Sequence, residues 1–359
     1  MNWGFLIMSS ISLLAQLGWR SCFQQQLDSN NDHNVLPARV TAVQRTVIDT
    51  LTVNGPLRVT LSAALLRAEG TVAVGDWVLI ETTTARVLRT LERQTVIARM
   101  AAGAEHRRQL IAANLDTLFV VTSCNADFNL ARLERYFALA YEARVEPVVI
   151  VTKSDLCANA DEYLDRLRDA APRVTALSMN ATTRGDLMRL SPWLAAGQTV
   201  AFVGSSGVGK STLINTLLDD DQQLTGGIRE DDAKGRHTTT SRQMFMLPAG
   251  AWIIDTPGMR EINIGASEEG VREVFADIET LAAGCRFRDC AHERESGCAV
   301  RQALATGELD ERRLRNYRKL QREAANAARS LHERRALNRQ SGQLYKNIKK
   351  QRRKDRGGE

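Results

Sequence analysis

The sequence has few cysteines and lacks a long uninterrupted apolar run. Only six cysteines occur among 359 residues, and three of them lie far from any other. Such sparse use excludes the disulfide framework of a small secreted protein. The first nineteen residues are apolar, but serines and a glutamine interrupt them, and no Lys or Arg precedes Arg20. Because a transmembrane helix needs about 20 mostly apolar residues and a signal peptide begins with basic ones, we expect a cytoplasmic protein with no membrane partner.

Charge is unevenly distributed along the chain, whose formal net charge is +6. Residues 311–359 contain 17 Lys or Arg against five Asp or Glu, whereas the first 310 residues contain 31 against 37. A basic segment on a mildly acidic body favours a polyanionic partner, and nucleic acid is the first candidate. The alternative is a solvated helix whose charge only aids solubility.

The region from residue 35 to residue 81 has the pattern of short β-strands. Segments 38–43 and 57–61 carry β-branched residues in near alternation, and a Gly-Asp turn separates two strand-like runs within residues 71–80. Several short strands in a stretch of about 65 residues are typical of a small OB-type barrel. An SH3-like barrel or an irregular β domain remains the alternative.

After about residue 109 the pattern changes to apolar runs separated by helical stretches. The runs cover residues 118–121, 148–151, 199–203 and 251–254. Alternation of apolar strands with helices predicts a parallel sheet covered on both faces. From about residue 269 onward the sequence is helix-like, apart from a cluster of cysteines.

A phosphate-binding loop is predicted between the third of these strands and the helix that follows it. The sequence Gly-Ser-Ser-Gly-Val-Gly-Lys-Ser matches the P-loop pattern in the required strand–helix context. Its glycines allow backbone amides to surround a phosphate at a helix N-terminus. Lys210 is expected to bridge the β- and γ-phosphates, and Ser211 to bind Mg²⁺. The predicted nucleotide-binding residues of this segment are Gly204, Ser205, Ser206, Gly207, Val208, Gly209, Lys210, Ser211 and Thr212.

A second motif, Asp-Thr-Pro-Gly at residues 255–258, follows the last apolar run. We expect the Asp255 carboxylate to hold Mg²⁺ through water and the Gly258 amide to meet the γ-phosphate. The same tetrapeptide suits an ordinary turn. Its distance after a phosphate loop favours the magnesium-sensing interpretation.

A third motif, Thr-Lys-Ser-Asp at residues 152–155, ends the second apolar run, at the sheet edge where ligands bind in α/β folds. The Asp155 carboxylate would accept two hydrogen bonds from guanine, and the Lys153 stem would lie along the base. Thr152 stands where this motif usually has Asn, and Ser154 completes it. Ser178 is expected to offer a backbone amide to guanine O6. The base-reading motif precedes the phosphate loop, which indicates a circularly permuted GTPase.

The segment Gly-Arg-His-Thr-Thr-Thr at residues 235–240 lies where a switch threonine should complete the Mg²⁺ shell. Thr238, Thr239 and Thr240 are all candidates, and Thr239 is our choice. Met259 follows the Asp-Thr-Pro-Gly motif where many GTPases carry a water-orienting Gln. We therefore assign His237 as the group that orients the attacking water, with a partner-supplied group as the alternative.

Three cysteines and one histidine crowd into fourteen residues as Cys285, Cys290, His292 and Cys298. Four soft ligands at short spacing predict a closed, tetrahedral, structural Zn²⁺ site. A loop with incidental free cysteines is the alternative.

Together these motifs resemble the RsgA family of small-ribosomal-subunit biogenesis GTPases, also called the YjeQ or EngC family. Residues 75–78 (Gly-Asp-Trp-Val), 109–116 and 299–300 match it as well. The resemblance implies GTP and Mg²⁺, one structural Zn²⁺, the 30S subunit with its 16S rRNA as partner, ribosome-stimulated hydrolysis in late 30S maturation, and release of other assembly factors. We also expect a monomer. The expected domains are an N-terminal extension (1–34), an OB-fold RNA-binding domain (35–100), a circularly permuted GTPase domain (101–268), a zinc-binding helical domain (269–335) and a basic tail (336–359).

Two other functions remain open from the sequence. One is a non-catalytic RNA-binding assembly factor that uses GTP as a structural ligand, which Met259 favours. The other is a P-loop ATPase or kinase in which the Thr-Lys-Ser-Asp motif is coincidental.

Overall fold

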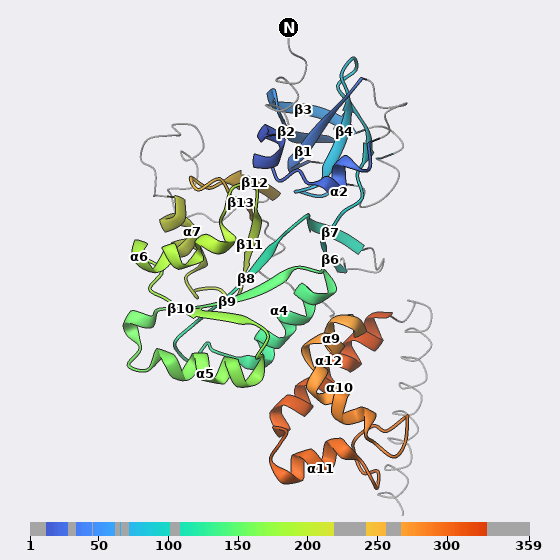
Figure 1. The fold of residues 1–359 in the computed structure, drawn as a ribbon, viewed down its shortest axis with the longest axis vertical. Helices are drawn as coiled ribbons and strands as arrows, with labels where there is room; N and C mark the ends of the chain where they lie inside the picture. The colour runs from blue at the N-terminus through green and yellow to red at the C-terminus, as the bar shows by residue number, and fades with distance from the viewer. Residues whose placement is uncertain are drawn as a thin grey trace, which may run out of the picture. The chain divides into compact units, whose positions relative to one another are not determined.

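The computed structural model describes residues 12–27, 34–44, 46–61, 65, 72–100, 108–218, 242–255 and 267–328. These form two compact units, one containing the described residues up to Asp255 and the other containing those from Ser267 onward (Figure 1). The predicted domain boundaries remain predictions. Among the described helices, none combines the length and the apolar character needed to cross a membrane.

A closed five-stranded barrel forms the N-terminal part of the first unit. Its strands are β1 (Val35–Val43), β2 (Val47–Thr52), β3 (Gly55–Leu61), β4 (Trp77–Glu81) and β5 (Arg86–Thr90). Their order is β1-β2-β3-β5-β4 with β4 returning to β1, and β3 and β5 run parallel. This confirms the predicted OB fold. Alternation along the strands directs Val40, Ile48 and Val78 into the barrel, where each is fully buried.

The second part of this unit is the predicted α/β sheet. Its parallel strands are β8 (Thr117–Ser123), β9 (Glu146–Thr152), β10 (Thr175–Ser178), β11 (Thr199–Val203) and β13 (Trp252–Asp255), and β12 (Arg242–Met246) is antiparallel. The order is β10-β9-β8-β11-β13-β12. Helices α4 (Leu130–Glu142) and α5 (Ala160–Ala170) lie on one side, and α6 (Arg184–Leu187) and α7 (Lys210–Leu218) on the other (Figure 1). Strands β10 and β12 were not predicted from the sequence.

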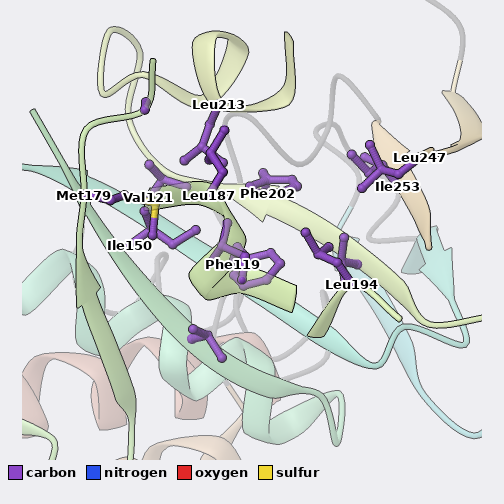
Figure 2. Close-up of a cluster of buried hydrophobic side chains, with 14 of the residues drawn as sticks. Phe119, Val121, Ile150, Met179, Leu187, Leu194, Phe202, Leu213, Leu247 and Ile253 are labelled. Atoms are coloured by element: carbon purple, nitrogen blue, oxygen red, sulfur yellow. The ribbon is translucent and has the colours of Figure 1, made fainter. Parts of the chain in front are cut away.

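An apolar cluster packs the central strands against α6, α7 and the 3₁₀ helix η2 (Met188–Trp193). Phe119 of β8 stacks on Phe202 of β11 with ring centroids 5.0 Å apart. Leu187 of α6 and Leu213 of α7 close the cluster from above (Figure 2). The cluster fixes the height of α7, and therefore of the loop that precedes it, over the sheet.

The barrel and the α/β sheet are parts of one continuous sheet of eleven strands. Strand β1 pairs with β12 through Ala42 opposite Gln243 and Val43 opposite Arg242. Strand β12 pairs on its other side with β13, where Gln243 lies opposite Asp255. A register shift in β1 between Val40 and Ala42 accompanies its change of direction. A separate hairpin of β6 (Val96–Met100) and β7 (Arg108–Ala113) leads from the barrel to β8.

The N-terminal residues 12–27, predicted as part of an extension, pack against both parts of the unit. The Trp19 ring meets Trp77 of β4 edge to face, with centroids 4.7 Å apart. On the other side, the Trp252 indole N–H of β13 donates to the Gln16 carbonyl at 2.9 Å. The short helix α2 (Ser21–Gln24) adds Phe23, which is 1% exposed. This segment is therefore part of the core rather than an appendage.

Arg39 of β1 is buried at the same junction, with 2% of its surface exposed. Its guanidinium donates to the Thr199 hydroxyl at 2.8 Å and to the Asn114 carbonyl at 3.3 Å, and it also bonds the Leu17 carbonyl. Burial lowers the pKa of Arg39 to about 10, so the side chain stays charged at neutral pH. The charge ties β1, the N-terminal segment and β11 together.

The second unit is helical, as predicted. Its helices are α9 (Glu268–Val274), α10 (Ala276–Ala283), α11 (Ala299–Thr306) and α12 (Glu311–Ala328). The Arg313 guanidinium donates two hydrogen bonds of 2.7 Å to the Asp277 carboxylate. It lies 4.8 Å from the centroid of the buried Phe275 ring. This contact joins α12 to α10.

Candidate nucleotide and metal sites

The predicted guanine and phosphate loops meet at one edge of the α/β sheet. The loops after β8, β9, β10, β11 and β13 all leave the carboxyl ends of parallel strands. In the sheet, β9 and β10 lie on one side of β8, whereas β13 and β12 lie on the far side of β11, so the connections diverge between β8 and β11. Ligands of open α/β sheets bind at such a reversal of strand order, because the loops diverge there and leave a crevice.

Three glycines shape the phosphate loop between β11 and α7. Gly204, Gly207 and Gly209 have φ values of 143°, 78° and 96°. A Cβ at Gly204 would lie 2.1 Å from the Val121 carbonyl oxygen, so a larger residue cannot pass beneath β8 there. The predicted pattern of glycines is thus required by the backbone conformation.

Lys210 and Ser211 are the first two residues of α7, at the end of the helix where unpaired backbone N–H groups attract anions. The Lys210 ammonium donates to the Gly204 carbonyl at 2.8 Å and also bonds the Ser205 carbonyl. The side chain therefore folds back over the loop that it is predicted to serve. Val208 is buried and anchors the loop to the core.

The base-reading loop lies directly beside the phosphate loop. Lys153 adopts the left-handed conformation, with φ 60°, and its ammonium donates to the Gly207 carbonyl at 2.9 Å. The short 3₁₀ helix η1 (Ser154–Leu156) then presents Asp155 to solvent. The Lys153 side chain thus spans the space between the two loops.

Thr152 makes a connection that was not predicted. Its side chain is fully buried, and its hydroxyl lies 2.5 Å from the Val208 carbonyl and 3.0 Å from the Thr122 carbonyl. One hydroxyl proton serves one of these acceptors at a time. Thr152 therefore links the base-reading loop to the phosphate loop.

The loop after β10 lies next to the base-reading loop. Ser178 ends β10 opposite Val151 of β9, and the next residue, Met179, donates its amide to the Val151 carbonyl at 2.9 Å. Ser178 is therefore at the predicted edge of the sheet. Beyond it, the Asp186 carboxylate accepts from the Asn180 amide at 2.7 Å and orders the turn.

Sequence reasoning missed the loop after β8, which borders the same site. The Cys124 amide donates to the Thr152 carbonyl at 2.9 Å. The Asn125 side chain accepts from the Ser123 hydroxyl and from the Asp127 amide, each at 2.9 Å. Burial, aided by the neighbouring Cys157, raises the pKa of Cys124 to about 11, so this thiol is not a nucleophile at neutral pH. The available signal was Ser-Cys-Asn directly after an apolar strand.

Asp255 ends β13 at the same carboxyl edge, half-buried. The other residues predicted near the γ-phosphate lie outside the described residues. They are His237, Thr238, Thr239, Thr240, Gly258 and Met259.

The second unit brings the four predicted metal ligands together. The ligand atoms of Cys285, Cys290, His292 and Cys298 all lie within 4.8 Å of one another. The Cys285 and Cys298 sulfurs are 3.8 Å apart, and His292 Nδ1 lies 3.6 Å and 3.4 Å from them. A tetrahedral Zn²⁺ with ordinary bond lengths requires separations of about 3.8 Å between sulfurs and about 3.6 Å from sulfur to nitrogen. The residues present therefore fit a tetrahedral metal ion.

The surroundings of Cys285 and His292 favour the protonation states that a metal needs, whereas burial raises the pKa of Cys290 to about 11. Burial also raises the pKa of Cys285, but hydrogen bonds from the backbone amides of Val300 and Ala299, at the start of α11, and from the neighbouring cysteines together lower it by more. Burial, aided by Arg318, lowers the pKa of His292 and keeps the imidazole neutral. Thiolate and neutral imidazole are the ligating forms.

Two side chains hold in place the metal loop, which comprises residues 285–298 and carries the four predicted ligands. The Arg318 guanidinium of α12 donates to the His292 carbonyl. The Glu295 carboxylate accepts from the backbone amides of Ala291, Glu293 and Arg294 at 2.8–2.9 Å. Hydrogen bonds from its own amide and its neighbours' amides lower the pKa of Glu295 to about 2. The loop is thus ordered by hydrogen bonds as well as by its ligands.

The order of the loops and the fold define the class of protein. The base-reading loop after β9 precedes the phosphate loop after β11, and an OB barrel and a Cys₃His helical unit flank them. The chain is a circularly permuted P-loop GTPase. Comparison with known families identifies the kind of GTPase. The family model described as RsgA GTPase matches residues 90–265.

Two curated relatives extend the match over almost the whole chain. The small ribosomal subunit biogenesis GTPase RsgA 2 of Vibrio vulnificus is 48% identical, covering 95% of this chain and 96% of the relative. The small ribosomal subunit biogenesis GTPase RsgA of Mesorhizobium japonicum is 47% identical, covering 88% and 90%. The chain belongs to the RsgA GTPase family. It is a GTP hydrolase, and its family implies GTP as substrate and Mg²⁺ as cofactor.

Solved structures agree on the fold. YjeQ from Thermotoga maritima has a TM-score of 0.61 at 22% identity, covering 82% of this chain and all of the other. The circularly permuted GTPase YloQ has a TM-score of 0.58 at 22% identity, covering 85% and all of the other. A model for ABC transporters also matches residues 187–344. That stretch contains the phosphate loop common to P-loop proteins but excludes the Thr-Lys-Ser-Asp motif.

Proposed function

We propose that this GTPase acts in late maturation of the 30S ribosomal subunit, binds 16S rRNA, and couples subunit-stimulated hydrolysis to the release of assembly factors. The observation that supports the proposal is the hydrogen-bonded junction that brings the base-reading loop and the phosphate loop side by side, where one guanine nucleotide would contact both. The names of the curated relatives supply the biological context. We propose that the protein acts in the cytoplasm and as a monomer. Sedimentation of the nucleotide-bound protein measures its oligomeric state.

The proposed binding roles follow from the positions of the loops. Asp155 accepts hydrogen bonds from guanine N1 and N2, which adenine lacks, and the amide beside Ser178 contacts guanine O6. Amides of the phosphate loop surround the β-phosphate, and Lys210 turns from its loop carbonyls to the β- and γ-phosphates. The remaining predicted contacts are those of Thr152, Lys153, Ser154, Thr212 and Gly258.

The hydrolytic step is proposed to depend on positioning. Bound Mg²⁺ supplies positive charge that neutralises the phosphate oxygens in the transition state. Ser211 and Thr239 would hold the ion, and Asp255 would hold it through water. His237 orients the attacking water in place of the glutamine that Met259 replaces. If His237→Ala left basal and stimulated hydrolysis both unchanged, this role would pass to a group supplied by the ribosome.

The metal at the Cys₃His cluster is proposed to be one structural Zn²⁺. Cys285, Cys290, His292 and Cys298 together close a four-coordinate shell and leave no position for substrate. The barrel and the basic residues 336–359 are proposed as RNA-binding surfaces.

Hydrolysis assays with 30S subunits, 50S subunits and free RNA test this function. We expect 30S subunits to accelerate phosphate release well beyond either of the others. Absence of any stimulation would favour a non-catalytic factor that uses GTP as a structural ligand.

Nucleotide choice tests the base-reading loop. The wild type should bind GTP and not ATP, and Asp155→Asn should transfer that preference to xanthosine triphosphate, because the amide reverses one donor–acceptor pair. Equal binding of ATP and GTP would point instead to a P-loop ATPase or kinase.

A further inference from the structure

An exposed aromatic side chain projects from the metal loop between two arginines. Phe287 is 44% exposed, and it is the one aromatic among the strongly exposed large apolar side chains of the described residues. Arg286 and Arg288 flank it, and both are exposed. A single exposed apolar side chain is ordinary on a protein surface, but an aromatic ring between two arginines suits a ligand that has both a flat face and negative charge.

The segment is held rigidly. Cys285 and Cys290, two of the predicted metal ligands, lie on either side of it. The Cys290 amide donates to the Phe287 carbonyl at 3.3 Å, and the Arg286 amide donates to the Gly297 carbonyl at 3.0 Å. An aromatic fixed before binding loses little conformational entropy when a ligand covers it.

The two guanidinium groups are available to a polyanion. Neither Arg286 nor Arg288 forms an ion pair with any residue that the structure describes. The Arg286 guanidinium lies 5.5 Å from the centroid of the Phe287 ring. It therefore covers part of the ring and supplies positive charge beside it.

Helix α12 extends the positive charge beside the loop. Arg318 bonds the loop at the His292 carbonyl, and Arg322 lies 3.9 Å from the Glu293 carboxylate. Lys319 is exposed between them in sequence. Of the three acidic side chains of the loop, Glu295 accepts three backbone amides and Glu293 faces Arg322, whereas Asp289, next to Arg288, is exposed.

We propose that Arg286, Phe287 and Arg288 form a binding site for one unpaired RNA base, with the ring stacking on the base and the arginines on the flanking phosphates. Every base, whatever the sequence, has a flat face on which an aromatic ring can stack. The phosphates on either side of it can bind guanidinium groups that have no ion-pair partner. This inference rests on the proposed function, since it names how the same chain contacts rRNA.

Fluorescence anisotropy with a labelled 12-nucleotide single-stranded RNA tests the site in the full-length, zinc-loaded chain. Phe287→Ala should weaken binding by about 5- to 150-fold, the range for one stacked base. Phe287→Trp should bind as wild type, because it keeps a stacking face. Met188→Ala, which truncates a side chain 75% exposed in the other unit, is the matched control and should change nothing.

Salt dependence tests the arginines. Arg288→Ala should reduce the slope of log K against log salt by about 0.7, the value for one phosphate contact on a single strand. RNA carrying 5-iodouracil should crosslink to the peptide that contains Phe287. Zinc content measured by chelator release should equal that of wild type in every variant, because Phe287 is exposed.

Three results would overturn the inference. Phe287→Ala could bind within twofold of wild type, Phe287→Leu could bind as tightly as wild type, or duplex RNA could compete as well as single-stranded RNA. The second result would indicate an apolar protein pocket as the occupant. Stimulation of the wild type by 30S subunits is measured separately, so failure of the proposed function is distinguishable from failure of this site.

Discussion

The hydroxyl of Thr152 gives a sharp test of how the two nucleotide loops are joined. Thr152→Val keeps the shape of the side chain but removes its proton donor from a fully buried position. The Val208 carbonyl of the phosphate loop then loses the donor that lies 2.5 Å away. Leaving a buried acceptor without a partner costs about 1–3 kcal/mol.

Most of this cost should appear in nucleotide affinity. Without nucleotide the phosphate loop can relax and expose its carbonyl to water, whereas bound phosphate holds the loop in its cradle shape. A cost of about 1–3 kcal/mol corresponds to roughly 5- to 150-fold weaker binding. GTP and GDP should be affected equally, because the hydroxyl contacts backbone carbonyls of Val208 and Thr122 and acts through the shape of the loop. Titration with fluorescent GTP and GDP analogues measures both.

Thr122→Val is the matched control in the neighbouring strand. Thr122 is 1% exposed, and its hydroxyl has no hydrogen-bond partner among the described residues. The same substitution there should leave affinity unchanged and leave stability unchanged or higher, since it removes an unsatisfied buried group. The reasoning is refuted if Thr152→Val binds both nucleotides within twofold of wild type, or if Thr122→Val loses as much.

Two further predictions concern the second unit. Removing the metal with a chelator should release one Zn²⁺ per chain and lower the helical circular dichroism signal. The tryptophan emission should not change, because all five tryptophans precede residue 267. A simultaneous change in tryptophan emission would contradict the division into separate units. Burial raises the pKa of Asp277, but the hydrogen bond and positive charge of Arg313, together with the backbone amides of Ile278 and Asp277, lower it by more, so the folded-state pKa lies below the unfolded one. The pair therefore stabilises the unit above the unfolded pKa of about 3.9 and loses this contribution as pH falls through the folded value. Since the Asp277 side chain is 47% exposed, Asp277→Asn should cost about 1–3 kcal/mol at neutral pH and flatten the acid dependence of thermal unfolding, and an unchanged acid profile would argue against the pair.

The sequence predicted the features that local chemistry dictates. The phosphate loop was found because three glycines must adopt positive φ beside a helix start. The Cys₃His cluster was found because its ligands are close along the chain. The barrel was predicted because its strands are buried on one face and therefore alternate apolar and polar residues. The parallel strands were predicted because they are buried on both faces and therefore form continuous apolar runs.

Features created by distant contacts were not predicted. Strand β12 has the sequence Arg-Gln-Met-Phe-Met, which does not by itself predict a strand. It is a strand because it pairs with β1 and β13. Trp19 and Phe23 resembled part of an extension because their partner, Trp77, lies more than fifty residues away. Thr152 was interpreted as the residue that replaces the usual Asn of the base-reading motif, and its contact with the phosphate loop was not predicted.

The pairing of β1 with β12 has a consequence for how the chain folds as it is made. Ala42 and its partner Gln243 are separated by about two hundred residues. At about 5–20 residues per second, β12 emerges roughly 10–40 s after β1. The barrel can close by pairing β4 with β1 long before that. The part of β1 at Ala42 and Val43 is then already in place for β12 to pair with. The last strands of the GTPase sheet are then added to a surface that was completed first, so the N-terminal barrel acts as a scaffold during synthesis.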